Sequence, residues 1–391
     1  MFSLHFKTVN SYTPYFKVRL VGETQNLLRV HFGTLLQLPH IDLKKLEKGD
    51  RDEEQRFLLG LQNYGAVDLA TNTKISTLFC NNLARKLFNY PINLLKTLTF
   101  QKYFNNTTDL NHESQRGYID TFTSKALIPL EQEDLGDANR YKNKAGWHYL
   151  DKVWLFGKDT NIFPPNKTGR NKPLPEQIND SFDAFTQIKE SLLQVFSKAY
   201  GTHAKNLRDV FNHHRSFTSD HLRFLYYPTY NEKKLSTSSS TMFYRHLEHT
   251  DRFSFLTLLP ASNVAGLEFQ HRNEWKRAPE LKDDHVLVMT GKQLEIMSGG
   301  QFKACPHRVT GTKEEMQTRR FSTAFFIRPN ITKKWSNFTN GQPIQFESKP
   351  VPPPGWYGLL QNNPNATQAD YDDLILKKET EYKIMTSTLA T

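Results

Sequence analysis

The sequence has little cysteine and no long apolar run. Cys80 and Cys305 are the only cysteines among 391 residues. They can form at most one bridge, which excludes a disulfide scaffold and a four-cysteine zinc site and favours a reducing compartment. No stretch approaches the roughly 18 consecutive apolar residues that a membrane-spanning helix needs. The mean hydropathy of −0.63 agrees, so we expect no association with a membrane.

The N-terminal segment lacks acidic residues. Residues 1–22 contain neither Asp nor Glu and carry Lys7, Lys17 and Arg19, a composition typical of weak organelle-targeting segments. No apolar segment precedes a signal-peptidase site, so secretion is not expected. We predict a cytoplasmic protein, with organelle import as the alternative.

The chain is basic but has no concentrated basic patch. Its 51 Lys and Arg residues outnumber its 40 Asp and Glu residues, for a net charge of +11. Such a balance suits nucleic acid or small anionic substrates. No run of five basic residues occurs, which favours an ordinary solvated surface. We therefore predict a monomer that takes a small-molecule substrate and no nucleic acid.

Helical periodicity dominates the first half of the chain. Apolar residues recur at three- and four-residue spacing over 52–64, 75–88 and 182–200, which predicts three amphipathic helices. Residues 104–180 are rich in Asn, Asp, Gly, Pro and Lys. This composition predicts irregular surface chain that covers a site or carries function.

Short strand-like runs separated by turn residues follow residue 222. Many short strands at this spacing are typical of a sandwich or a jelly roll. The sequence thus predicts an α+β fold with a jelly-roll core at 216–330, a mainly helical region at 1–215, and a Pro-rich segment with a helical tail at 331–391. The runs are 222–227, 253–259, 267–270, 286–290, 301–304 and 321–327.

Three histidines are each followed two positions later by a carboxylate. In a chain of this composition about 1.4 such pairs are expected by chance, so the pattern needs context. Residues i and i+2 of a strand lie on one face, close enough to bind one ion. Only His249/Asp251 immediately precedes a strongly apolar strand, so we interpret the other two pairs, His40/Asp42 and His246/Glu248, as structural.

A second histidine, His307, lies 58 positions after His249, a distance that several antiparallel strands can span. Two histidines and one carboxylate occupy one face of an octahedron and leave three positions open, as in non-haem Fe(II) oxygenases. Zinc fits the same donors. His249, Asp251 and His307 are therefore predicted metal ligands.

Arg320 and Ser322 follow His307 on the last strand and share one face of it. An arginine grips a carboxylate with two hydrogen bonds, and a serine hydroxyl adds a third. This pair predicts a seat for an organic acid beside the metal, which favours iron. Arg245 shares strand parity with His249 and is a candidate clamp for a substrate carboxylate, with a solvent-exposed arginine as the alternative.

At this point the chain resembles the isopenicillin N synthase-like Fe(II)/2-oxoglutarate-dependent dioxygenases. The similarity covers most of residues 38–328, and its upstream part consists of LPHIDL at 38–43, NYG at 63–65 and RGY at 116–118. The core motifs follow the family order: LRFLYYP at 222–228, HTD at 249–251, LTLL at 256–259, GLEF at 266–269, Trp275, Gly291, HRV at 307–309 and RFS at 320–322.

The resemblance implies a double-stranded β-helix and an enzyme that uses Fe(II), 2-oxoglutarate and O2, with ascorbate as a candidate reductant. By this resemblance His249, Asp251 and His307 hold iron, while Arg320 and Ser322 hold the distal carboxylate of 2-oxoglutarate. Tyr227 adds a hydroxyl to the cosubstrate. The chain departs from many members at Leu225, where they have Asn, which thins the polar support beside the cosubstrate.

Three functions are compatible with these residues. The first is oxidation of an unactivated C–H bond of a small molecule by hydroxylation, desaturation or cyclisation, with release of succinate and CO2. This reaction would suit natural-product biosynthesis and an anionic, amino-acid-derived substrate. The second is an oxidase of the isopenicillin N synthase type, which uses no 2-oxoglutarate. The third is a catalytically silent binding or scaffold protein, which the intact metal-ligand set disfavours.

Overall fold

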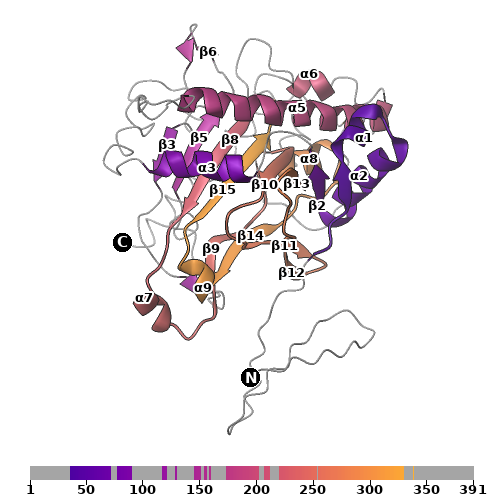
Figure 1. Ribbon diagram of the computed structural model, residues 1–391. Coiled ribbons are helices and arrows are strands. Elements are labelled where there is room, and N and C mark those ends of the chain that lie inside the picture. The colour runs from indigo at the N-terminus through magenta and orange to yellow at the C-terminus, as the bar shows by residue number, and fades with distance from the viewer. Residues whose placement is uncertain are drawn as a thin grey trace, which may run out of the picture.

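Two β-sheets and a long helix that crosses the larger sheet dominate the fold (Figure 1). The residues that the structure describes include every predicted metal ligand. The computed structural model describes residues 36–71, 77–89, 117–120, 128–129, 145–150, 154–155, 158–159, 173–201, 207–211, 220–252, 254–329 and 338.

Eight consecutive strands form the predicted jelly roll. Apart from the β11–β12 hairpin they alternate between the sheets: β8, β10, β13 and β15 belong to the larger sheet, and β9, β11, β12 and β14 to the smaller one. The alternation places the two sheets around a common interior, and the predicted α+β class is confirmed. The strands are β8 (His221–Tyr227), β9 (Met242–His249), β10 (Leu256–Pro260), β11 (Leu267–His271), β12 (Glu274–Arg277), β13 (His285–Thr290), β14 (His307–Thr312) and β15 (Arg320–Ile327).

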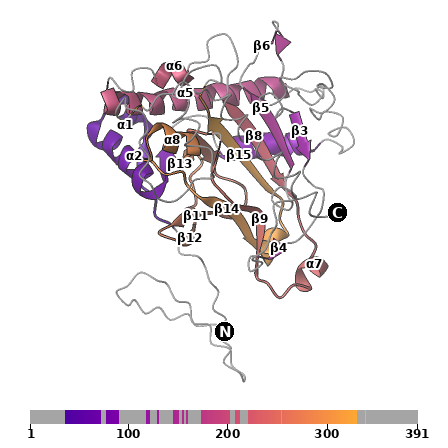
Figure 2. The same ribbon diagram turned by 180° about the vertical axis from the view of Figure 1, so that it is seen from behind.

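Strands from the N-terminal region extend both sheets. The larger sheet has the order β1-β2-β13-β10-β15-β8-β5-β3, and β4 (Ile128–Pro129) closes the smaller one beside β9. The division predicted at residue 215 therefore stays a prediction, since the larger sheet crosses it. Figure 2 shows β3 and β5 beside β8 at one end of the sheet. The bounds are β1 (His40–Asp42), β2 (Ala66–Ala70), β3 (Gly117–Asp120) and β5 (Ala145–Leu150), with a separate hairpin of β6 (Trp154–Leu155) and β7 (Lys158–Asp159).

The predicted helices occur with small shifts at their ends. Helix α2 (Arg51–Tyr64) begins after Asp50, whose side chain accepts the amides of its first turn, and ends at Gly65 with φ 69°, as expected for a left-handed cap. The helix predicted at 182–200 is α5, and it begins earlier, at Leu174. Pro175 lies in its first turn, where a proline is compatible with a helix. The remaining helices are α1 (Leu43–Lys48), α3 (Thr77–Phe88), α5 (Leu174–Tyr200), α6 (Leu207–Phe211), α7 (Glu232–Ser236), α8 (Lys292–Met297) and α9 (Lys313–Met316).

Helix α5 packs on the outer face of the larger sheet through aromatic side chains. Phe185 stacks on Phe325 of β15 with ring centres 5.0 Å apart. Phe196 meets Phe255 edge to face at 5.3 Å. The alternate residues of β15, beginning at Arg320 and Ser322, point away from this core and line a pocket. Strand periodicity thus gives β15 one face for packing and one for chemistry.

Two predicted segments differ from the structure, and a third lies almost wholly outside the described residues. Residues 301–304 form no strand, because side chains take up their backbone hydrogen bonds. The amide of Phe302 donates to the Ser298 hydroxyl, and that of Ala304 donates to the Glu295 carboxylate. Within 104–180, predicted to be irregular, β5 pairs with β8 along six residues. The predicted tail at 331–391 lies outside the described residues except for Phe338, which packs on Phe196. Among the helices that the structure describes, none is long and apolar enough to cross a membrane.

A buried ion pair joins α5 to the chain entering β8. Lys189 Nζ lies 2.7 Å from Asp220 Oδ2, and both side chains are almost fully buried. Asp220 Oδ1 also accepts the backbone amide of Arg328, 3.0 Å away, just after β15. The pair therefore links the helix to two neighbouring strands.

We predict that Asp220→Asn lowers the free energy of unfolding by about 3–5 kcal/mol, because it leaves the buried Lys189 ammonium with only the more distant and half-exposed Glu190 carboxylate as a partner. Urea denaturation followed by circular dichroism measures the change. Lys198→Met is the control, since it removes a more exposed pair with Glu54 and should cost less than about 1 kcal/mol. Equal stability of the two variants would contradict this assignment.

Candidate active site

A pocket of about 630 Å³ opens between the two sheets of the jelly roll. Its walls come from both sheets and from the loops that join them. His249, Asp251, His307, Arg320, Ser322 and Tyr227 all line it. The structure thus brings six of the seven predicted site residues together in one cavity.

The three predicted metal ligands converge at one end of the smaller sheet. His307 begins β14 and lies directly opposite His249, the last residue of β9. Nε2 of His249 is 3.9 Å from Asp251 Oδ1, and Nε2 of His307 is 3.8 Å from the same oxygen. One ligand atom from each residue lies within 4.8 Å of the others.

Backbone carbonyls orient both imidazole rings. His249 Nδ1 is 2.8 Å from the carbonyl oxygen of Leu247, and His307 Nδ1 is 3.1 Å from that of Cys305. A carbonyl only accepts hydrogen bonds, so each Nδ1 carries the proton and each Nε2 keeps its lone pair. Both histidines are therefore held in the tautomer that binds a metal through Nε2.

A threonine orients the carboxylate. Thr257 Oγ1 donates to Asp251 Oδ2 at 2.6 Å, which leaves Oδ1 facing the two imidazoles. Thr257 is 1% exposed, and its hydroxyl also contacts that of Ser254 at 2.9 Å. Two imidazole nitrogens and one carboxylate oxygen with an open side form a donor set suited to Fe(II).

Arg320 and Tyr227 form the far wall of the pocket. They face each other across the β8–β15 pair, and the Arg320 guanidinium lies 5.0 Å from the centre of the Tyr227 ring. Burial raises the pKa of the Tyr227 phenol, against the opposing charges of Arg320 and Arg245. The hydroxyl therefore stays protonated at neutral pH and can donate a hydrogen bond.

The donors of Arg320 fit a carboxylate. Arg320 is 3% exposed, and its Nε donates to the carbonyl oxygen of Val264 at 3.1 Å. Its Nη1 is buried and makes no hydrogen bond within the described residues. Ser322 is buried two positions along the same face. A buried guanidinium with a donor to spare, next to a hydroxyl, suits the distal carboxylate of 2-oxoglutarate.

Arg245 does not line the pocket. Two register shifts in β9, between the partners of His307 and Thr310, interrupt the alternation of side chains. Its Nη2 instead donates to the carbonyl oxygens of Glu315 and Thr318. Burial lowers the pKa of the Arg245 guanidinium to about 10, and the charge of Arg320 acts in the same direction. Arg245 thus adds positive charge behind Arg320.

The pocket contains functional candidates that the strand pattern did not single out. His246, interpreted as structural, stacks on His249 with ring centres 4.1 Å apart because of the same irregularity in β9. Arg223, His221 and Arg328 line the other part of the pocket. Arg223 and His221 lie on the same face of β8 as Tyr227, at even spacing from it. This spacing is the feature of the sequence that could have predicted that they line the pocket.

The comparisons with known proteins agree with this geometry. Residues 218–329 match the family model described as the 2OG-Fe(II) oxygenase superfamily. This segment contains all eight strands of the jelly roll and every predicted site residue. By this match, residues 218–329 are similar to the 2OG-Fe(II) oxygenase superfamily. The isopenicillin N synthase-like label within it rests on the resemblance of the motifs.

Two curated relatives extend the similarity beyond the matched segment. Jasmonate-induced oxygenase 1 of Arabidopsis thaliana is 24% identical over 75% of this chain and 64% of its own length. A 2-oxoglutarate-dependent dioxygenase of Aspergillus rugulosus is 29% identical over 74% of this chain and 87% of its own. The alignment thus spans less than two thirds of the first of these relatives.

A solved structure supports the fold. A Neurospora crassa protein, crystallised at full length with alpha-KG and 5-formyluracil, superposes with a TM-score of 0.59 at 22% identity and covers 79% of this chain and 91% of its own. At this level of identity the likeness concerns the jelly-roll architecture, which agrees with the alternation of strands between the two sheets.

We predict that Thr257→Val weakens Fe(II) binding by about 10- to 100-fold, the usual effect of losing a residue that orients a metal ligand. Valine keeps the shape of threonine and removes the hydrogen bond to Asp251. Anaerobic Fe(II) titration measures the affinity. Thr257→Ser keeps the hydroxyl and is the matched control, so equal loss in both variants would assign the effect to packing.

Proposed function

We propose that this protein is an Fe(II)/2-oxoglutarate-dependent oxygenase that oxidises an unactivated C–H bond of a small molecule. The reaction is hydroxylation, desaturation or cyclisation, with release of succinate and CO2. The observation that carries the proposal is the convergence of His249, Asp251 and His307 in a pocket whose opposite wall presents Arg320. The combination of metal ligands with a seat for an organic acid favours this oxidation over metal-assisted hydrolysis.

The side chains divide the work. His249, Asp251 and His307 would hold Fe(II) on one side and leave its remaining positions to ligands from the pocket. Arg320, Ser322 and Tyr227 would hold and orient the distal carboxylate of 2-oxoglutarate. When bound, iron and 2-oxoglutarate supply the oxidising chemistry with O2.

The pocket wall supports an anionic substrate. Arg223 lies on β8 opposite Ala324, and His221 lies opposite Phe326. The guanidinium of Arg223 stacks over the Phe326 ring at 4.6 Å, and its Nη2 is 3.3 Å from His221 Nδ1. Arg328 follows β15 and lines the same pocket.

This cationic wall lies farther along β8 and β15 than the proposed cosubstrate seat. The strands run from the Arg320/Tyr227 pair to the Phe326/His221 pair. A molecule held at Arg223 and Arg328 is thus distinct from one held at Arg320. Among the described residues, the acidic ones lining the pocket besides Asp251 are Glu248 and Glu280, and both are exposed. We therefore propose a small substrate with at least one carboxylate.

We predict a weak visible charge-transfer band when Fe(II) and 2-oxoglutarate are added under anaerobic conditions, and its loss in His249→Ala and Asp251→Ala. Removal of either ligand breaks the set that holds iron. An unchanged band in these variants would remove the assignment of the ligands.

In Arg320→Ala, we expect iron binding to persist and the dissociation constant of 2-oxoglutarate to rise about 10- to 100-fold, since a charge-assisted hydrogen bond contributes about 1.5–3 kcal/mol. Titration of the same band measures it. Arg319→Ala, an exposed neighbour, is the matched control. Unchanged 2-oxoglutarate affinity in Arg320→Ala would favour the oxidase that uses no 2-oxoglutarate.

We predict that Arg223→Gln raises the KM of a carboxylate substrate at least tenfold and leaves substrate-independent succinate formation unchanged. The substrate comes from a screen of carboxylic and neutral metabolites for stimulated succinate formation. Arg51→Gln, which alters an exposed arginine at the start of α2, controls for net charge. Stimulation by neutral compounds alone would contradict an anionic substrate.

A further inference from the structure

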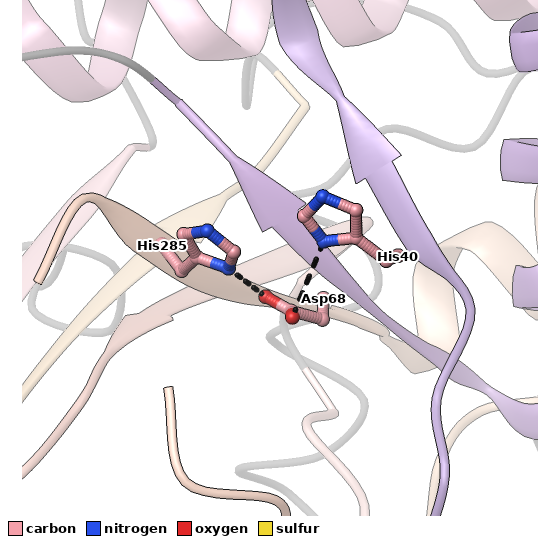
Figure 3. A group of neighbouring side chains, drawn as sticks. All are labelled: His40, Asp68 and His285. Carbon is pink, nitrogen blue, oxygen red and sulfur yellow. Dashed lines mark hydrogen bonds and ion pairs between the residues drawn. The ribbon is translucent and has the colours of Figure 1, made fainter. Parts of the chain in front are cut away.

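A second group of two histidines and one carboxylate lies at the edge of the larger sheet. His40 comes from β1, Asp68 from β2 and His285 from β13, which are three neighbouring strands. Figure 3 shows both imidazole rings directed at the Asp68 carboxylate. One ligand atom from each residue lies within 4.8 Å of the others. The mechanism proposed above uses none of these three side chains.

The contacts within the group are those of ligands around a common point. His285 Nδ1 is 2.8 Å from Asp68 Oδ1, and His40 Nδ1 is 3.5 Å from Asp68 Oδ2. The two rings stack with centres 5.0 Å apart and planes inclined by 21°. Each carboxylate oxygen therefore faces the Nδ1 atom of one ring.

A second carboxylate supports the buried histidine. His285 Nε2 lies 3.7 Å from Asp284 Oδ1, and the backbone of Asp284 is held by Thr71, which donates to its carbonyl oxygen. With no ion bound, His285 Nδ1 donates its proton to the Asp68 carboxylate. An ion at Nδ1 would replace that proton, and the Asp284 carboxylate would then favour the proton at Nε2.

The strands hold the donors in place while leaving access to solvent. His40 pairs with Asp68 across β1 and β2, and His285 pairs with Ala70 across β13 and β2. The side chain of His285 is 6% exposed and that of Asp68 is 20% exposed. That of His40 is 53% exposed. Water can therefore complete the coordination on the His40 side.

We propose that His40, Asp68 and His285 bind a divalent transition-metal ion, with Zn²⁺ as the best match. Two imidazole nitrogens and one carboxylate oxygen suit Zn²⁺, whereas Mg²⁺ and Ca²⁺ prefer oxygen ligands alone. The ion ties the three-residue strand β1 to the sheet. It also ties β13 to the sheet edge. Leu287, two residues after His285 on this strand, lines the pocket.

The test uses the full chain, freed of any polyhistidine tag, with the proposed iron site removed by His249→Ala and His307→Ala. Isothermal titration with Zn²⁺ is expected to show one ion per chain and a rise in Tm of several degrees, because the ion binds the folded state. Adding His40→Ala should weaken binding at least tenfold and abolish the rise in Tm. Adding His271→Ala instead, which removes a histidine stacked on Tyr64 outside the group, should change neither.

No Zn²⁺ binding in the background variant, or equal binding after His40→Ala, would overturn the proposal. If the background variant does not fold, Co²⁺ stoichiometry in the otherwise unaltered chain decides. Replacing His40 by Ala must then lower the number of bound ions by one. Because the His40-dependent ion is counted separately from the one that depends on His249, this result is independent of the proposed oxygenase function.

Discussion

The antiparallel pairing of β14 with β9 is the constraint on which the site depends. It sets His307 opposite His249, although 58 positions separate them in the chain. Local hydrogen bonds then complete the geometry: two carbonyls select the imidazole tautomers, and Thr257 turns the Asp251 carboxylate. Long-range topology thus brings the ligands together, and short-range contacts orient them.

The larger sheet separates structural and chemical roles within single strands. Along β15, Phe325 packs beneath α5, while Arg320 and Ser322 face the cavity. Along β8, Tyr227 and Arg223 share the cavity face. The sheet therefore arranges two cationic regions in sequence along the same pair of strands, one around Arg320 and one around Arg223. This spacing separates the proposed seat for the cosubstrate from the proposed seat for the substrate.

Strand parity and motif spacing predicted much of the site because regular strands preserve them. Arg320 and Ser322 face the cavity from β15, as two-residue periodicity requires, and His249 and Asp251 also line it, although Asp251 follows the end of β9. Arg245 does not, since register shifts in β9 change which way its side chain points. The sequence pattern contained no signal for these shifts.

Other features depended on contacts between distant residues. The amides of 302 and 304 are satisfied by Ser298 and Glu295 rather than by a strand. The edge group of His40, Asp68 and His285 forms only when β2 lies between β1 and β13. Neither arrangement is visible in local periodicity, because each needs the folded path of the chain.

The buried Lys189–Asp220 pair has a bearing on how such a protein can diversify. Asp220 anchors α5. By accepting the amide hydrogen of Arg328, it also positions the chain just after β15, beside the cationic wall. A change in the packing of the helix can therefore reach the proposed substrate side of the cavity without replacing a residue that lines it. The shape of the cavity is thus open to adjustment from the outer layer of the fold, with every metal ligand retained.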